Sequence, residues 1–308
     1  MKIAALDFGS NTFLCLIAEV TAAGITKIYS DEVEVVRLGQ DLNRTKRFHP
    51  DALARAEKCI QKFAARIAEH QPEKVLAMAT SAARDAENRE ELFKLGERHQ
   101  IPIEIIPGEQ EALITYQGAV SAYAQSSTNR LVIDIGGGST EFIFGRGNTL
   151  LTGESYDIGC VRLTEKFITQ QPTPQNEIKA VTDFVDAAIL KATALMPENF
   201  RLEQILAVAG TPTSLVAAEI GGYDAARVDG YILTEEKLKH WLEKLTNASV
   251  GEKIKLGIPE GRADVILIGV ITLLRTLQNF SLKELVVSTR GVRYGVALEM
   301  ARRFLPQP

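Results

Sequence analysis

Two stretches of the chain each join an aspartate to a turn rich in glycine and hydroxyl side chains. Residues 6–13 read LDFGSNTF, and residues 133–142 read IDIGGGSTEF. In both, an apolar run ends in aspartate, a short turn follows, and a second apolar run begins. Glycines and small polar residues let successive backbone N–H groups converge on an anion. Each turn could bind one phosphate group, although a short glycine motif taken alone also fits an ordinary hairpin.

The two turns supply most of the candidate phosphate-binding residues, which are Gly9, Ser10, Asn11 and Thr12 in the first and Gly136, Gly137, Gly138, Ser139 and Thr140 in the second. Asp7 and Asp134 precede the turns at equivalent places. A carboxylate beside a phosphate is repulsive unless a divalent cation lies between them, as Mg²⁺ does in phosphoryl-transfer sites. The paired motifs therefore predict metal-assisted chemistry on a phosphate.

The pattern around the first turn predicts the elements that position it. Three apolar runs within residues 2–37 indicate an antiparallel meander. Beyond it, the periodicity predicts strands at 74–80 and 101–107 and helices at 50–70, 81–100 and 109–125.

From residue 130 the same plan begins again, with a second three-run meander around the second turn. Further helices are predicted at about 174–196, at 234–247 and at 260–279, and another begins at about Pro212. Strands are predicted at 204–210 and 284–289, and a final helix follows Gly291. The repeat predicts two α/β domains with mixed sheets. We place them at 1–126 with the C-terminal helix, about 296–308, and at 127–295.

Composition narrows the function classes. The 308 residues carry 45% hydrophobic and 24% charged side chains and a net charge of -4, which fits a globular protein and argues against a basic nucleic-acid binder. The three cysteines form no readable disulfide or CxxC motif. No export signal is visible, and the longest apolar run, 265–274, is too short to cross a membrane. We expect a cytoplasmic protein with no nucleic-acid or membrane partner.

Eight segments together resemble a known family. They are ALDFGSNTFLCLIAEV, ATSAARDAENRE, IIPGEQEA, VIDIGGGSTEF, IGCVRLTE, VAGTPTSL, GRADVILIG and STRGVRYGVALE. In this order they resemble the signatures of the exopolyphosphatase and guanosine pentaphosphate phosphohydrolase family, in its short form. The family is part of the actin, sugar kinase and heat-shock ATPase superfamily. The resemblance implies two ribonuclease H-like domains of the actin-like ATPase fold, with the active site in the cleft between them.

The resemblance also assigns roles to two residues of the first domain. Glu111, in GEQEAL, matches the proposed catalytic glutamate, so we expect it to be the general base. An acidic residue in the first turn of a helix also stabilises the helix dipole, which is the alternative role. Arg84, in TSAARD, matches a phosphate-binding arginine whose planar fork suits phosphate oxygens. Its alternative is an exposed salt bridge.

In the second domain, the resemblance makes Asp134 and Glu141 the Mg²⁺ ligands, with Asp7 contributing through water. An exposed strand residue is the alternative for Glu141. Gly210 and Thr211 end a strand and open a helix, where an N-terminus favours an anion. Asp229 stands where the family often has histidine, so the role of that position stays open.

The leading hypothesis is an exopolyphosphatase that releases terminal orthophosphate from inorganic polyphosphate. Hydrolysis of guanosine pentaphosphate is the alternative, because both substrates present a phosphoanhydride end. A small-molecule kinase of the same superfamily would need a purine pocket, and a nucleotide-switched structural protein would need an interaction surface. A homodimer is left open. The sequence contains no GxxxxGK[ST], HExxH or GxSxG motif.

Overall fold

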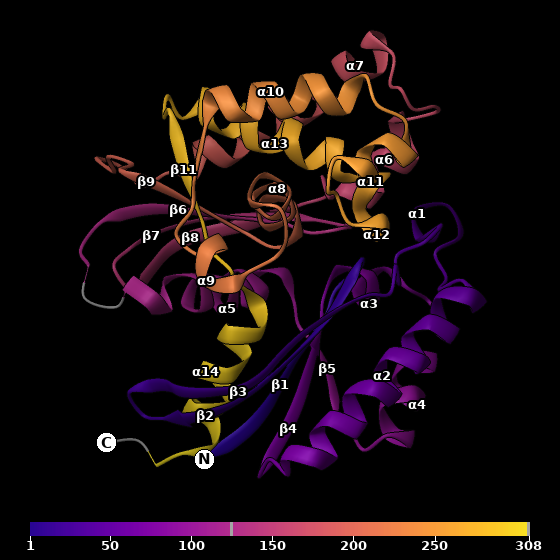
Figure 1. The fold of residues 1–308 in the computed structure, drawn as a ribbon. Helices are drawn as coiled ribbons and strands as arrows, with labels where there is room; N and C mark the ends of the chain where they lie inside the picture. The colour runs from indigo at the N-terminus through magenta and orange to yellow at the C-terminus, as the bar shows by residue number, and fades with distance from the viewer. Residues whose placement is uncertain (124–125, 307–308) are drawn as a thin grey trace. The chain divides into compact units, whose positions relative to one another are not determined.

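A computed structural model describes residues 1–123 and 126–306 (Figure 1). Contacts divide the chain into two compact units, Met1–Ala122 with Arg290–Pro308 and Tyr123–Thr289. These limits lie a few residues from the predicted ones. The reason is that the C-terminal helix α14 (Val292–Phe304) packs from its first turn against α5 (Gly108–Val120), so that Gly291 and Gly295 closely approach Gly118.

In its described residues, the first unit has five strands and, besides α5 and α14, four α-helices. The strands are β1 (Lys2–Phe8), β2 (Thr12–Thr21), β3 (Gly24–Val35), β4 (Lys74–Ala79) and β5 (Ile103–Ile105). The helices before α5 are α1 (Leu42–Thr45), α2 (Pro50–His70), α3 (Ser81–Asp85) and α4 (Glu90–Arg98), and a 3-10 turn (Ser121–Tyr123) follows α5.

The sheet of the first unit has the order β3-β2-β1-β4-β5 and is mixed, because the meander pairs are antiparallel and the β1–β4 and β4–β5 pairs are parallel. Alternate residues of β1 point to opposite faces, so this strand contributes to two cores. Leu6 and Phe8 pack on the side of α2, while Ile3 and Ala5 pack on the side of α14. Helices therefore cover both faces (Figure 1).

In the described part of the second unit there are six strands and eight α-helices. The strands are β6 (Asn129–Ile135), β7 (Thr140–Arg146), β8 (Thr149–Tyr156), β9 (Gln204–Val208), β10 (Ile232–Thr234) and β11 (Glu284–Val287). The helices are α6 (Cys160–Phe167), α7 (Gln175–Ala194), α8 (Gly210–Ile220), α9 (Ala225–Val228), α10 (Glu235–Thr246), α11 (Val250–Lys255), α12 (Glu260–Ala263) and α13 (Ile266–Asn279).

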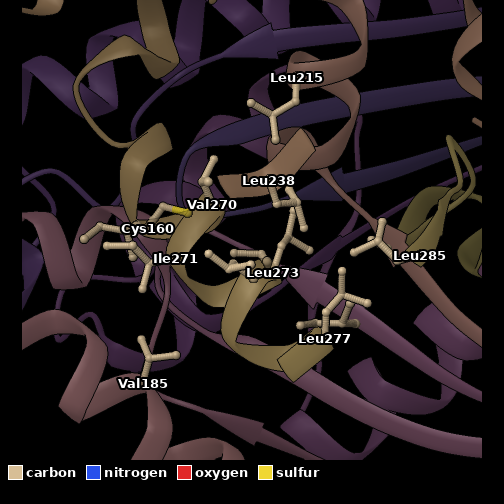
Figure 2. Packing of buried hydrophobic residues seen from close by; sticks show 14 of the residues in the cluster. Cys160, Val185, Leu215, Leu238, Val270, Ile271, Leu273, Leu277 and Leu285 are labelled. Atoms are coloured by element: carbon tan, nitrogen blue, oxygen red, sulfur yellow. The ribbon is translucent and has the colours of Figure 1, made fainter. Parts of the chain in front are cut away.

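Its sheet has the order β10-β11-β9-β6-β7-β8. Without β10, this order and its strand directions repeat those of the first unit, with β6 in the place of β1. The predicted duplication and the predicted α/β class with mixed sheets are confirmed. The core centres on α13, whose Val270, Leu273 and Leu277 pack with side chains from α8, α10 and β11 (Figure 2).

Some predicted elements differ from the structure. The helix expected over 81–100 is interrupted, because Ala86 is extended and the Asn88 side chain instead bonds the backbone N–H and carbonyl of Phe48. The last two residues of the helix expected over 109–125 lie outside the described residues. No helix within the described part of the chain is long and apolar enough to span a membrane.

Candidate active site

The first glycine turn, residues 9–12, is closed by a hydrogen bond from the Gly9 N–H to the Thr12 carbonyl (3.1 Å). The turn is supported from one side by the segment that follows β3. The N–H groups of Val36 and Arg37 both donate to the Asn11 carbonyl, at 2.9 and 2.8 Å, and the Gly39 N–H donates to the Ser10 carbonyl at 2.8 Å. We call this turn phosphate loop 1.

The support fixes the direction of the amide donors in phosphate loop 1. In a trans peptide the C=O of one residue and the N–H of the next point in opposite directions. The N–H groups of Asn11 and Thr12 therefore point away from the supporting segment. Among the described residues, neither the Ser10 nor the Asn11 N–H finds a backbone acceptor, and the buried Asn11 side-chain amide has no hydrogen-bond partner. A buried polar group without a hydrogen-bond partner in the protein is suited to bind a ligand.

The second turn, residues 136–139, repeats this geometry and is called phosphate loop 2. The Gly136 N–H donates to the Ser139 carbonyl at 3.0 Å. Here the first turn of α6 provides the support, and its backbone N–H groups, together with that of Gly159, donate to the carbonyls of Gly136, Gly137 and Gly138. The N–H groups of the loop therefore point away from α6, as in phosphate loop 1.

Close packing under phosphate loop 2 explains one glycine. A Cβ atom on Gly159 would lie 2.4 Å from the Gly137 carbonyl oxygen and 2.4 Å from the carbonyl carbon of Gly138. No side chain fits between α6 and the loop at this position. Gly159 was not among the residues predicted from the sequence, although it belongs to the IGCVRLTE segment.

Asp134 and Glu141 are direct partners across the antiparallel strands β6 and β7. Directly opposed residues project from the same face of a sheet and lie close together. Both are buried, with exposed fractions of 7% and 1%, so Glu141 is not an exposed strand residue. The Ser155 hydroxyl donates to Glu141 Oε1 at 2.6 Å. Two adjacent carboxylates repel each other, and a cation between them removes that repulsion.

The carboxylate pair fits Mg²⁺, which commonly takes one or two protein carboxylates and completes its shell with water and substrate phosphates. Among the described residues, no cluster of three or more His, Cys, Asp or Glu side chains forms a complete protein cage. In the first unit Asp7 occupies the place that Asp134 has in the second, and its cross-strand partner is Leu14. Phosphate loop 2 thus adjoins two carboxylates, whereas phosphate loop 1 adjoins one.

Glu111 and Arg84 meet in the first unit. Glu111 lies in the first turn of α5 and is buried, and Arg84 lies in α3. Arg84 Nη1 donates to Glu111 Oε2 at 2.6 Å and to the Ile106 carbonyl at 2.9 Å. Among the described residues, Arg84 Nε and Nη2 make no hydrogen bond, so these donors are available to a phosphate. The alternative considered for Arg84, an exposed salt bridge, does not hold, because its ion pair with Glu111 is partly buried.

A further contact joins α3 to phosphate loop 1. The Ser10 and Ser81 hydroxyls lie 2.8 Å apart in a buried hydrogen bond. Because Ser81 begins the helix that carries Arg84, this bond ties the loop to the same short helix. Phosphate loop 1, Arg84 and Glu111 are thereby linked within one unit.

Gly210 and Thr211 open α8, as expected. Ala209 before them has φ 70° and ψ -164°, a strained conformation for a residue with a side chain. No side chain caps this helix N-terminus, so its first amides are suited to an anion. The Thr211 hydroxyl lies 3.6 Å from Cys160 Sγ and packs on Gly269. The backbone of Thr211, rather than its hydroxyl, is therefore the group suited to a phosphate.

Arg262 is a candidate that the sequence reasoning missed. Its guanidinium covers Gly210, where a Cβ would lie 1.7 Å from Arg262 Nη1. Burial lowers the pKa of this guanidinium, against the opposing effect of Cys160. The available signal was an arginine just before the apolar run 265–274, in a segment already matched to the family. Asp229, by contrast, binds the N–H and hydroxyl of Thr289, so it has a structural partner.

A profile of the Ppx/GppA phosphatase family matches residues 16–304. The chain belongs to the Ppx/GppA phosphatase family. Exopolyphosphatase 2 of Mycobacterium tuberculosis is 32% identical, over 97% of this chain and 98% of that protein. A Ppx/GppA protein of Aquifex aeolicus has a solved structure that is 29% identical, with a TM-score of 0.82 and coverage of 100% of this chain and 99% of that one.

A solved exopolyphosphatase-like protein is also similar to this Ppx/GppA member. It is 32% identical, with a TM-score of 0.92, and the match covers 99% of this chain and all of the other. These similarities extend over the whole of both units. The predicted family is therefore confirmed, and with it the class of enzyme, a phosphatase.

Proposed function

We propose that this Ppx/GppA phosphatase is an exopolyphosphatase, which hydrolyses the terminal phosphoanhydride bond of inorganic polyphosphate. The observation that carries the proposal is the pair formed by Glu111 and Arg84, a buried carboxylate held by a guanidinium that retains free donors. This pair offers a base for water and a donor for phosphate oxygens at one place. In a Ppx/GppA member, that combination supports hydrolysis rather than transfer to an acceptor.

In the proposed reaction Glu111 accepts a proton from a water molecule, whose oxygen attacks the terminal phosphorus. The bond between this phosphorus and the bridging oxygen breaks, and the bridging oxygen leaves on the shortened chain. Orthophosphate is the other product. Arg84 Nε and Nη2 bind non-bridging oxygens, where donors stabilise the charge that develops in the transition state.

Each phosphate loop is proposed to bind phosphate oxygens of the substrate. The outward N–H groups of the loops and the Asn11 side-chain amide suit non-bridging oxygens. We retain Ser10, Thr12, Ser139 and Thr140 as further candidate phosphate-binding residues, and Gly9 as the residue whose N–H closes phosphate loop 1. Gly136, Gly137 and Gly138 leave the backbone accessible. The N-terminus of α8, at Gly210 and Thr211, is proposed to bind a more distant phosphate with Arg262.

We propose that Asp134 and Glu141 hold Mg²⁺, with Asp7 contributing through water. When bound, the ion offsets negative charge on the phosphate oxygens. The support for this assignment is the buried cross-strand pair of carboxylates, which suits a hard cation that keeps water and phosphate ligands. The three buried free cysteines fit a reducing compartment, and we retain the cytoplasm as the proposed location.

The test is orthophosphate release from polyphosphate, guanosine pentaphosphate and ATP, measured in parallel with and without Mg²⁺. Because the similar Mycobacterium tuberculosis protein is named an exopolyphosphatase, we propose polyphosphate as the preferred substrate of this chain. We expect the highest kcat/KM with polyphosphate and loss of activity without the metal. A preference for guanosine pentaphosphate would change the substrate, and a requirement for ATP with an acceptor would replace the hydrolase by a kinase.

A further inference from the structure

Phosphate loop 1 and phosphate loop 2 are supported in different ways. Behind phosphate loop 2 lies the first turn of α6, a regular helix whose N–H groups are already aligned. Behind phosphate loop 1 lies the segment 36–40, which belongs to neither a helix nor a strand. We call this segment the loop 1 support. An irregular segment needs other interactions to hold its N–H groups in one direction.

The loop 1 support contains an unfavourable backbone conformation. Arg37 has φ 55°, in the left-handed region that residues with a side chain seldom adopt. With this conformation, the consecutive N–H groups of Val36 and Arg37 both reach the Asn11 carbonyl. Such conformations persist only where the surroundings hold them, and they concentrate at functional sites.

Arg55 of α2 supplies the interactions that hold the loop 1 support. Its Nε donates to the Val36 carbonyl at 2.7 Å, and its Nη2 donates to the Arg37 carbonyl at 3.3 Å and to Gln40 Oε1 at 2.7 Å. One planar guanidinium thus binds three acceptors along five residues. A lysine, with a single nitrogen, cannot reproduce this fork.

We infer that Arg55 is a positioning residue for phosphate loop 1. It holds the loop 1 support, the support holds the Ser10 and Asn11 carbonyls, and the peptide group between Ser10 and Asn11 then directs the Asn11 N–H toward the substrate. Arg55 itself does not touch the substrate in this scheme. The expected effect of Arg55 on catalysis rests on the proposed function. Its expected effect on the geometry of phosphate loop 1 does not.

The test compares Arg55→Met and Arg55→Lys with Arg66→Met. Arg66 lies on the same helix and binds Glu32 Oε1 of β3 at 2.7 Å and Glu69, so its loss removes a similar side chain away from the loop. We expect Arg55→Met to lower kcat/KM for polyphosphate by about 10- to 100-fold, since small misplacements of binding groups have effects of this size. Arg55→Lys should recover part of the activity, and Arg66→Met should resemble the wild type.

The split between KM and kcat separates positioning from simple loss of folded protein. Unfolding lowers the apparent kcat at constant KM, whereas misdirected donors also raise KM. A rise in KM for Arg55→Met, with cooperative thermal unfolding retained, is the expected result. Wild-type KM and kcat in Arg55→Met would overturn the inference and leave the proposed function intact.

Hydrogen exchange gives a readout that does not depend on activity. The Val36, Arg37 and Gly39 amides should exchange faster in Arg55→Met than in Arg66→Met, because their bonds to Asn11 and Ser10 open more often. Unchanged exchange would overturn the inference even if the wild type hydrolysed no polyphosphate. If these amides exchange faster in Arg55→Met but the wild type does not hydrolyse polyphosphate, the positioning role of Arg55 is supported and only the proposed substrate is refuted.

Discussion

Arg84 Nη1 lies 2.6 Å from Glu111 Oε2, and this contact joins α3 to the first turn of α5. The same nitrogen donates to the Ile106 carbonyl at 2.9 Å, so the guanidinium is held at two points. Because its other nitrogens keep their donors, one side chain can orient the proposed base and bind phosphate. The first prediction follows from this double role.

Replacing Arg84 should impair catalysis strongly. Arg84→Met removes both the partner of Glu111 and the phosphate donors, so we expect kcat for phosphate release to fall by about 100-fold or more. Arg84→Lys should retain an intermediate rate, since one cationic nitrogen remains in place of the three of the guanidinium. The matched control is Arg98→Met on α4, which breaks an exposed pair with Glu57 of α2. Equal rates in Arg84→Met and Arg98→Met would remove Arg84 from the site.

A methyl group at Gly159 should displace phosphate loop 2. Gly159→Ala places a Cβ 2.4 Å from the Gly137 carbonyl oxygen, which is far inside contact distance, so either the loop or α6 must move. We expect a higher KM for polyphosphate and a loss of about 1 to 3 kcal/mol in the free energy of unfolding. Gly251→Ala is the control, because nothing lies within 4 Å of its Cβ. Steady-state kinetics and chemical denaturation decide the point, and unaltered kinetics in Gly159→Ala would contradict it.

The Asp134–Glu141 pair makes a prediction about metal. Chelation with EDTA should abolish phosphate release, and Asp134→Asn and Glu141→Gln should each raise the Mg²⁺ concentration needed for half-maximal rate. In the absence of metal, either change should stabilise the fold by about 0.2 to 1 kcal/mol, because it removes repulsion between opposed carboxylates. Glu154→Gln, an exposed change on β8, is the control. Full activity in EDTA would refute the metal assignment.

Lys253 should make stability depend on pH. Its side chain is fully buried, its Nζ donates to Gln171 Oε1 at 2.5 Å, and burial lowers the pKa from 10.5 to about 8, although Asp264 opposes this shift. Below pH 8 the amine is protonated in both states, and the folded state bears the cost of burying the charge. Between pH 8 and 10.5 the unfolded state binds more protons, so this contribution to stability rises with pH.

Lys253→Met isolates this effect. The variant should gain stability relative to the wild type at pH 7, and the gain should shrink by on the order of 3 kcal/mol as the pH rises to 10.5. Lys255→Met changes an exposed lysine on the same helix and serves as the control. Denaturation curves at several pH values provide the measurement. A stability difference that does not vary with pH would refute the lowered pKa.

Local sequence patterns predicted much of the fold. The two meanders, the helix over 50–70 and the repeat from residue 130 follow from apolar periodicity and turn residues, and the structure contains all of them. The break between α3 and α4 could not be predicted this way, because the Asn88 side chain competes with the helix through bonds to Phe48, 40 residues earlier. Strand β10 is three residues long and carries too little periodicity to be recognised.

In the candidate site, too, some residues could be predicted from local sequence motifs and others could not. Asp7, Asp134, Glu111 and the residues of the two turns stand in readable motifs, and Asp134 and Glu141 prove to be cross-strand partners. Arg55 lies outside any such motif, and Arg262 lies in the GRADVILIG segment, whose sequence does not reveal the contact with Gly210. Their roles depend on contacts with Val36 and Gly210, which are distant in sequence. Only the tertiary structure brings those groups together.

The measurement that tests the central claim most directly is orthophosphate release by Glu111→Gln, with polyphosphate binding measured on the same samples. Glu109→Gln, an exposed change in the same turn of α5, is the control. We predict that Glu111→Gln lowers kcat by about 100- to 10,000-fold, the contribution of a general base, while polyphosphate affinity stays close to that of the wild type. Full turnover in Glu111→Gln would contradict the account.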